Sequence, residues 1–382
     1  MSIAADAPIA KPRAAARHPK TADVPVAQTS SSPLRSLQIG RGLAALMVVL
    51  FHLNNSVWGI PKYFDQPFSP LLSSGNAGVN FFFVLSGFII YLVHASDVGA
   101  PNRLPTFAWR RFVRVYPVYW LVLLGFIAAL LVDSGLGTAD ERRLGNFIAS
   151  ILLVPYPLDP ILSVAWTLTH EVLFYAMFAV AIVSARAGLL LFAVWQIGCL
   201  VNMVAGSPQF PFGVIFASYN LLFAFGLIAA YLFKVGRCPR PGLIALTGIA
   251  AFLAIALHQA GAPAPFAKDV YIFAYGLASA VTLLGACTYE RRHGLRAPKL
   301  LDALGDASYS IYLLHLPLLS LLAKALFASG AAAVLPQWLS LVLLLAAVAG
   351  IGIAFSRRVE MPLIAALSRR NARPLAVRPR PV

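Results

Sequence analysis

The chain has 382 residues, of which 59% are hydrophobic and only 12% charged, and its mean hydropathy is +0.78. This composition excludes an ordinary water-soluble protein. The net charge of +16 would suit a nucleic-acid partner, but the basic residues lie in short connectors between apolar runs, so no such partner is predicted.

The chain order predicts a tail followed by a membrane domain. Residues 1–36 are rich in Ala, Pro and Ser, without an apolar run long enough for a signal peptide, and we expect a disordered, basic cytoplasmic tail. Beyond it, each membrane crossing needs about 20 mostly apolar helical residues. Ten stretches meet this requirement: 37–57, 76–96, 113–133, 164–185, 187–205, 213–234, 242–259, 268–288, 306–329 and 335–357. The sequence therefore predicts an all-α integral membrane protein, with a transmembrane domain over 37–358 and a cytoplasmic tail over 359–382.

A further apolar stretch, 145–157, is short and is followed by a proline-rich segment, 155–160. We expect it to be interfacial or re-entrant. Lys and Arg concentrate on the cytoplasmic side of membrane proteins. With ten crossings and both termini inside, 24 of the 30 basic residues lie on inner segments and four on outer ones. An eleventh crossing would place about half of them outside.

Cysteine spacing gives no sign of a metal or redox site. Cys199, Cys238 and Cys287 lack metal-ligand spacing and leave one odd thiol. Neither a disulfide framework nor a bound metal is predicted.

The first two spans and the start of the third carry unusual polar residues. Arg41 and His52 are eleven positions apart, which is about 20° past three full helical turns and about 16 Å along the axis. They share one helix face, with Arg41 near the cytoplasm and His52 near mid-membrane.

Ser86, in the second span, lies in a Ser-Gly pair that favours close helix packing. Arg111 and Arg114, three apart, suit phosphate oxygens, although juxtamembrane arginines also contact lipid headgroups.

The fourth span carries Glu171, the only acidic residue that we expect deep inside a span. Thr167 and Tyr175 lie four residues before and after it, on the same face. A carboxylate in this position either becomes neutral or pairs with a cation, for which His52 and Arg41 are the candidates. The neighbouring His170 points about 100° away and is expected to be structural.

The ninth span has a polar face formed by Ser308, Tyr312 and His315, at helical spacing. Such a face needs hydrogen-bond partners or a polar ligand. After the tenth span, Glu360 with a nearby arginine is expected to close the bundle as an ion pair.

In this order, the segments resemble the acyltransferase type 3 family of integral membrane acyltransferases, especially members that modify exopolysaccharides. The resemblance covers about 37–363 and differs at His170, where many relatives have another residue. Its motifs are Arg41 with His52, Phe82-Phe83-Val84-Leu85-Ser86-Gly87-Phe88, Arg111 and Arg114 with Tyr116-Pro117, Trp166 to Glu171 with Phe174-Tyr175, Ser308 to Leu313 with His315, and Glu360-Met361-Pro362.

The resemblance implies transfer of an acyl group, most often acetyl from cytoplasmic acetyl-CoA, to a hydroxyl of an exopolysaccharide or lipid-linked glycan. Imidazole can remove the proton of a sugar hydroxyl, so His52 is expected to be the general base, with an acyl-imidazole as the alternative. Arg41, Arg111 and Arg114 would hold the phosphates of CoA. Glu171 would orient or stabilise the histidine, or bind the sugar.

The other motif residues are expected to bind substrate: Ser86, Trp166, Tyr175, Ser308, Tyr312 and His315. The implied partners are the bilayer of a bacterial inner membrane, acyl-CoA, the glycan acceptor and polysaccharide-synthesis machinery. Two other functions fit a polar bundle interior or a membrane scaffold: a flippase for a lipid-linked glycan, or a non-catalytic component of a synthesis complex. The sequence shows no duplicated halves, which disfavours the flippase.

Overall fold

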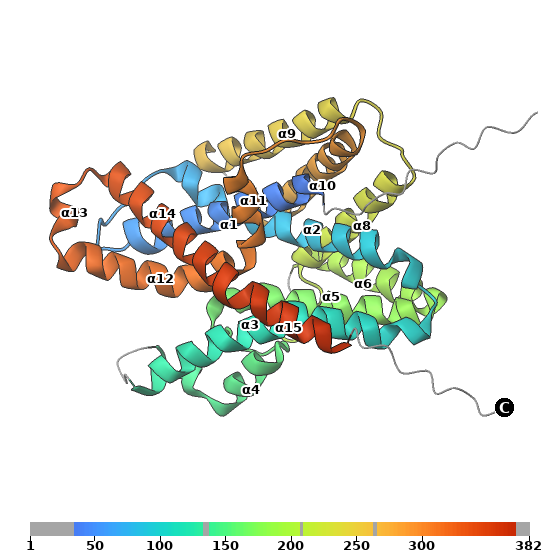
Figure 1. The fold of residues 1–382 in the computed structure, drawn as a ribbon, viewed down its shortest axis with the longest axis horizontal. Coiled ribbons are helices and arrows are strands. Elements are labelled where there is room, and N and C mark those ends of the chain that lie inside the picture. Colours follow the sequence, from blue (N-terminus) through green and yellow to red (C-terminus); the bar gives the residue numbers. More distant parts are fainter. Residues whose placement is uncertain (1–33, 133–136, 207–208, 263–265, 372–382) are drawn as a thin grey trace, which may run out of the picture. The chain divides into compact units, whose positions relative to one another are not determined.

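The computed structural model describes residues 34–132, 137–206, 209–262 and 266–371, and every regular element within them is helical (Figure 1). The α-helices are α1 (Arg35–Leu53), α2 (Ala77–His94), α3 (Leu104–Val132), α4 (Leu144–Leu152), α5 (Trp166–Val183), α6 (Ala185–Ala205), α7 (Phe212–Ile215), α8 (Leu221–Lys234), α9 (Pro241–Gly261), α10 (Lys268–His293), α11 (Lys299–Asp306), α12 (Ser308–Ala328), α13 (Ala331–Val334), α14 (Gln337–Phe355) and α15 (Met361–Asn371). Short 3₁₀ or π turns join several of them: η1 (Asn54–Trp58), η2 (Pro70–Asn76), η3 (Ala95–Asp97), η4 (Pro101–Arg103), η5 (Asp140–Arg142), η6 (Ser163–Ala165), η7 (Ser218–Asn220) and η8 (Ser356–Glu360).

Ten helical segments of the described chain are long and apolar enough to cross a membrane, and they confirm the ten predicted spans. They are Arg35–Trp58, Pro70–Asp97, Pro101–Val132, Ser163–Val183, Ala185–Ala205, Phe212–Lys234, Pro241–Gly261, Lys268–His293, Ser308–Ala328 and Gln337–Arg369. The protein is therefore a multi-pass membrane protein. The predicted N-terminal tail falls almost wholly outside the described residues.

The additional stretch at 145–157 forms the nine-residue helix α4, which is too short to cross a bilayer. The helix stops because Leu153 adopts a left-handed conformation, with φ of 54°, and prolines follow it. Its last carbonyl groups accept hydrogen bonds from α3. Tyr119 donates to the Ser150 carbonyl at 2.7 Å, Trp120 to Ile151 at 2.8 Å and Tyr116 to Leu152 at 2.9 Å. Three aromatic donors thus fix this helix end.

Helix α2 packs extensively against α8, and glycine makes this possible. A Cβ added at Gly87 would meet the backbone of Phe223, and one added at Gly226 would meet the backbone of Val84. The two backbones therefore approach as closely as small residues allow in membrane helices. The close approach agrees with the prediction from the Ser-Gly pair, and Ser86, the neighbour of Gly87, is half-buried beside it.

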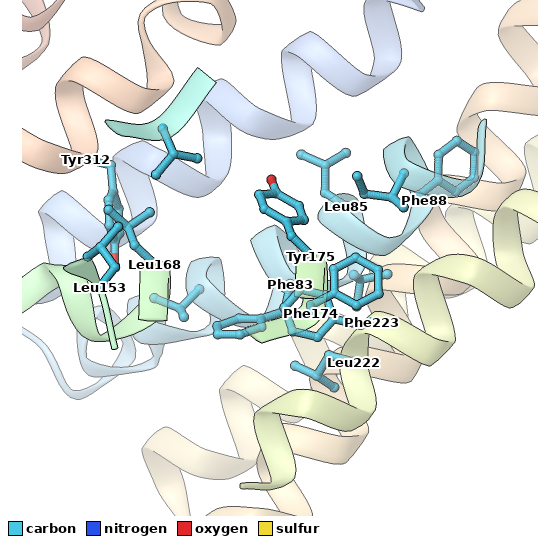
Figure 2. Packing of buried hydrophobic residues seen from close by; sticks show 14 of the residues in the cluster. Phe83, Leu85, Phe88, Leu153, Leu168, Phe174, Tyr175, Leu222, Phe223 and Tyr312 are labelled. Carbon is cyan, nitrogen blue, oxygen red and sulfur yellow. The ribbon is translucent and has the colours of Figure 1, made fainter. Parts of the chain in front are cut away.

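The core beside α2 is aromatic. The rings of Phe174 and Phe223 stack with centroids 4.2 Å apart, and Phe83 lies edge-on to Phe223 at 5.1 Å. Figure 2 shows these rings grouped together while the hydroxyl of Tyr175 points away from them. This packing holds α2, α5 and α8 together on one side of the site described below.

The last span continues beyond its predicted end at 357. Helix α14 runs through the π turn η8 into α15, and α15 packs against α3. The turn carries Glu360, whose side chain is only 1% exposed. The extended tenth span thus brings a buried carboxylate into the helix bundle.

Candidate functional site

A cavity of about 310 Å³ lies between α1, α2, α3, α5, α8 and α12. Eight of the eleven predicted site residues line it: Arg41, Ser86, Arg111, Arg114, Glu171, Tyr175, Ser308 and Tyr312. Apolar side chains of α2 and the ring of Phe223 complete its wall. The cavity is therefore apolar with a few convergent charged and hydroxyl groups, as ligand sites usually are.

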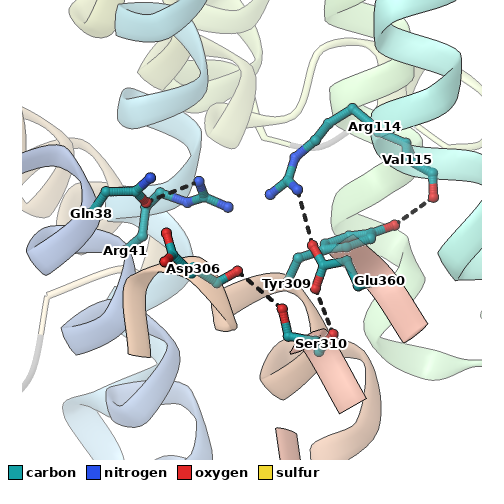
Figure 3. A network of polar contacts seen from close by, with 9 residues as sticks. Gln38, Arg41, Arg114, Val115, Asp306, Tyr309, Ser310 and Glu360 are labelled. Atoms are coloured by element: carbon teal, nitrogen blue, oxygen red, sulfur yellow. Dashed lines mark hydrogen bonds and ion pairs between the residues drawn. The ribbon is translucent and has the colours of Figure 1, made fainter. Parts of the chain in front are cut away.

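The three cavity arginines differ in their partners. Arg114 donates to Glu360 at 3.0 Å, and the other carboxylate oxygen of Glu360 accepts from Ser310 at 2.6 Å. Arg41 contacts only the side-chain oxygen of Gln38, at 3.3 Å. Figure 3 shows the guanidinium groups of Arg41 and Arg114 pointing towards each other from two helices. Glu360 thus neutralises Arg114, whereas Arg41 has no carboxylate within ion-pair distance in the described chain.

Arg111 is held by a histidine that the sequence analysis did not single out. Nδ1 of His94 lies 2.7 Å from the carboxylate of Asp97, which can only accept, so Nδ1 carries the proton when the ring is neutral. Nε2 then has a lone pair that accepts from the Arg111 guanidinium at 3.3 Å. The same guanidinium lies 5.7 Å from the ring centre of Tyr175. Asp97 and His94 therefore orient Arg111 without neutralising it directly.

Two polar atoms at the cavity lack a partner. Nε of Arg111 and Oγ of Ser308 are buried and make no hydrogen bond. Buried polar atoms without partners are rare, because each costs about 1–3 kcal/mol. Both residues line the cavity. An anionic ligand in the cavity would meet the charge of Arg41, which has no carboxylate partner in the described chain, whereas Nε of Arg111 and Oγ of Ser308 would be reached only after their side chains move.

Glu171 makes neither of its two expected cation contacts. One of its carboxylate oxygens accepts a hydrogen bond from Ser86 at 2.7 Å and another from the hydroxyl of Tyr175. No hydrogen bond or ion pair joins Glu171 to His52 or Arg41. Two hydroxyl groups, on its own helix face and on α2, take up the carboxylate instead. No direct contact therefore supports the first of the expected roles, the orientation of His52, and the stabilisation of the histidine and the binding of the sugar stay predictions.

The partner of His52 is another histidine. Nδ1 of His315 donates to the Tyr312 carbonyl at 2.6 Å, so Nε2 of the neutral ring accepts, and it lies 3.2 Å from Nδ1 of His52. Nδ1 of His52 also lies 2.9 Å from the Val48 carbonyl and must carry the proton. Nε2 of His52 keeps its lone pair and has no hydrogen-bond partner in the described chain. The network therefore leaves a free imidazole base at His52.

The cavity does not bring all predicted residues together. His52, His315 and Trp166 are absent from its lining. Tyr312 connects the two regions, because it lines the cavity while its ring lies 5.8 Å from that of His315. Its hydroxyl bonds to Thr167 at 2.9 Å and to the Val164 carbonyl at 3.1 Å. The histidine pair thus does not line the cavity and is linked to it through Tyr312.

Some of the site could not have been read from the sequence. Glu360 was expected to pair with an arginine close to it in sequence, but its partner is Arg114, 246 positions away. The His94–Asp97 pair has i, i+3 spacing, which is a usable signal once α2 is known to continue to this point. Tyr309 donates a hydrogen bond to the Val115 carbonyl at 2.8 Å. The sequence analysis included Tyr309 only as part of a motif and predicted no role for it. In the described parts of the chain, no group of three His, Cys, Asp or Glu side chains forms a metal site.

Comparison with known proteins gives two matches. The family model of the Acyl_transf_3 acyltransferase domain matches residues 34–357. The chain is 31% identical over 311 residues to the exopolysaccharide production protein ExoZ of Rhizobium meliloti strain 1021, an alignment that covers 76% of this chain and 90% of that protein. No solved structure shows a significant match.

Proposed function

Because the chain belongs to the acyltransferase type 3 family, we propose that this membrane acyltransferase transfers acetyl from acetyl-CoA to a hydroxyl group of an exopolysaccharide or of its lipid-linked precursor. One observation carries the choice of donor. The cavity presents three arginines and one carboxylate, and only one of the arginines is paired with a carboxylate. The phosphates of CoA are the anions that such a site would bind, since guanidinium groups match phosphate oxygens in geometry and charge.

The donor would lie with its phosphates at Arg41 and Arg111 and its pantetheine arm along the apolar wall formed by α2. The thioester would then pass Tyr312 to reach His52. Tyr312 is buried among core side chains and hydrogen-bonded to Thr167 and Val164, so its ring would have to move aside for the thioester to pass. Glu171, with Ser86 and Tyr175, would contact the pantetheine amides or a sugar hydroxyl.

His52 would act as the general base. Nε2 of His52 takes the proton of the acceptor hydroxyl while the hydroxyl oxygen attacks the thioester carbonyl. The C–S bond breaks, and the CoA thiolate takes the proton back from the imidazolium. His315 would stabilise the imidazolium, because its Nε2 accepts from the proton on Nδ1 of His52. Direct transfer needs no covalent enzyme intermediate, and an acyl-imidazole at His52 is the second route.

The orientation follows from the charge distribution. Both termini would lie in the cytoplasm of a bacterium, with Arg41, Arg111 and Arg114 at the inner end of the bundle in the inner membrane. CoA made in the cytoplasm could then reach the cavity, and polysaccharide-synthesis enzymes would deliver the acceptor.

The test replaces His52 by Ala in cells that make the polysaccharide. Mass spectrometry of the exported glycan should show the loss of one acetyl mass increment per modified sugar, with the amount of exported glycan unchanged. Loss of export with acetylation intact would instead indicate a flippase. Retained acetylation with normal export would remove His52 from the mechanism.

A further inference from the structure

We propose that a second cavity, beside α4 and the start of α5, is a subsite that binds one neutral sugar ring of the acceptor glycan. The inference rests on the proposed function for the identity of the acceptor. The cavity measures about 100 Å³, and its lining includes Tyr156, Asp159, Trp166, Thr169 and His170. This volume is about a third of that of the arginine-lined cavity, so a sugar ring would be held partly within the cavity and partly over the exposed Asp159.

Helix α5 separates the two cavities. Thr167 and Glu171 line the first, whereas Trp166 and His170 line the second. The ring of Phe83 lines the first cavity and lies 6.2 Å from Trp166 and 5.8 Å from His170. The first turns of α5 thus present one face to a cationic site and another to a site of different chemistry.

The charge of the second cavity excludes CoA as its ligand. Its lining contains no arginine and no lysine, and it includes the carboxylate of Asp159. The side chain of Asp159 is exposed and makes no ion pair or hydrogen bond in the described chain. Phosphates would be repelled here, whereas a carboxylate is a strong acceptor for sugar hydroxyl groups.

His170 supplies a second acceptor, and its protonation follows from its neighbours. Asn220 donates through Nδ2 to the carbonyl groups of Val214 and Ile215, at 3.1 and 2.9 Å, so its side-chain oxygen is the acceptor. That oxygen lies 3.0 Å from Nδ1 of His170, which therefore carries the proton. Nε2 of His170 is left with a lone pair and no partner in the described chain. The sequence analysis treated His170 as structural, and its contact with Asn220 is structural; the free nitrogen remains available to a ligand.

Aromatic groups complete the subsite. The indole N–H of Trp166 and the hydroxyl of Tyr156 make no hydrogen bond in the described chain. Such rings offer an apolar face with a polar edge, which suits the alternating C–H and hydroxyl surface of a sugar. Trp166 lies two residues after Val164, whose carbonyl accepts a hydrogen bond from Tyr312. The subsite is therefore near the residue that links the first cavity to the histidine pair. A ring bound here would belong to the same glycan as the reacting hydroxyl without itself being acylated.

The subsite can be tested by sugar binding to the full chain in lipid nanodiscs. The probes are the methyl glycosides of glucose, galactose and mannose, observed by saturation-transfer NMR, with CoA binding measured in parallel by calorimetry. Asp159→Ala should weaken binding of the recognised glycoside by about tenfold or more, because a charge-assisted hydrogen bond is lost. His170→Asn keeps a hydrogen-bond donor for Asn220 but removes the acceptor Nε2. This variant should therefore also bind the glycoside more weakly.

The matched control is Asp140→Ala. Asp140 lies in the same segment between α3 and α5, forms an exposed ion pair with Arg143 and does not line the cavity. This variant should bind glycoside normally, and all three variants should bind CoA as the unaltered protein does. Equal glycoside binding in the Asp159 and Asp140 variants, or none by the unaltered protein, would overturn the subsite while CoA binding and acetyl transfer remain intact. Failure of the proposed function would show instead as absent CoA binding and absent transfer.

Discussion

At the scale of single residues, the arginines of the cavity have separate tasks. Arg114 is paired with Glu360, whereas Arg41 and Arg111 form no ion pair in the described chain. The family motif treats Arg111 and Arg114 alike, so only the structure distinguishes them. We therefore propose that Arg41 and Arg111 carry most of the charge that binds the donor.

Arg41→Gln should weaken CoA binding by about ten- to a hundredfold, since a hydrogen bond to a charged group contributes about 1.5–3 kcal/mol. Calorimetry on the purified protein measures this change. Arg110→Gln is the matched control, because Arg110 is exposed and does not line the cavity. Equal losses in the two variants would indicate a general effect of surface charge.

Asp97→Asn should raise KM for acetyl-CoA and leave kcat nearly unchanged, because it disturbs the histidine that positions Arg111 without touching the reacting atoms. With Asn, His94 can adopt the other tautomer, and its Nε2 can become a donor that no longer accepts from Arg111. Steady-state kinetics with varied acetyl-CoA checks this. A fall in kcat at constant KM would assign the pair a different role.

The sequence predicted the residue types of the site better than their pairings. Spacing placed Thr167, Glu171 and Tyr175 on one helix face, and the cavity contains all three. Spacing within one helix cannot show which residue of another helix comes opposite. For this reason the partners of Glu171 and His52 were not foreseen, although both lie within ordinary hydrogen-bond reach of residues from the same set of motifs.

At the scale of elements, short irregular turns bring the polar groups to the bundle. The π turn η1 begins two residues after His52, and the π turn η8 carries Glu360. Such turns change the direction of side chains within an otherwise continuous helix and often occur at functional sites. Sequence patterns with a 3.6-residue period do not predict them, which explains why the tenth span continues past its predicted end.

The ion pair between α3 and η8 should stabilise the bundle. Glu360→Ala removes the partner of Arg114 and the acceptor of Ser310, and it should lower the free energy of unfolding by about 3 kcal/mol. Thermal unfolding in detergent measures the change. A double-mutant cycle with Arg114→Ala gives the coupling between the two side chains, and additive effects would contradict a direct pair.

The end of α4 should depend on its buried aromatic donor. Tyr119 is fully buried, so Tyr119→Phe leaves the Ser150 carbonyl with one acceptor bond fewer and should cost about 1–3 kcal/mol. Tyr116 is half-buried and its bond is solvent-exposed, so Tyr116→Phe should cost clearly less. The two variants are compared by thermal unfolding. Equal losses would mean that these hydrogen bonds do not fix α4.

At the scale of the whole molecule, composition and hydropathy predicted the helical fold class and the ten candidate spans. Ten apolar stretches became ten helices, because backbone groups in lipid must be satisfied within a helix. Helix packing between distant segments, such as α2 against α8, could not be derived in the same way, since it depends on which small residues meet. The site lies at these contacts, so its geometry required the structure.

The proposed orientation predicts a labelling pattern in intact cells. The three native cysteines are buried, so an introduced exposed cysteine should dominate the reaction with a membrane-impermeant maleimide. Ala139→Cys, before α4, should be labelled from outside, whereas Asn102→Cys, before α3, should react only after the cells are opened. The reverse pattern would invert the orientation, and labelling of both sites from outside would contradict the predicted crossing by α3.

The central claim is that acetyl-CoA bound at Arg41 and Arg111 from the cytoplasmic side delivers its acetyl group through His52. The most direct measurement adds radiolabelled acetyl-CoA to sealed vesicles of either orientation and follows label into the glycan. We predict transfer only in inverted vesicles, lost by about a hundredfold or more with His52→Ala and retained with Arg110→Gln. Transfer in right-side-out vesicles, or at an undiminished rate with His52→Ala, would contradict the account.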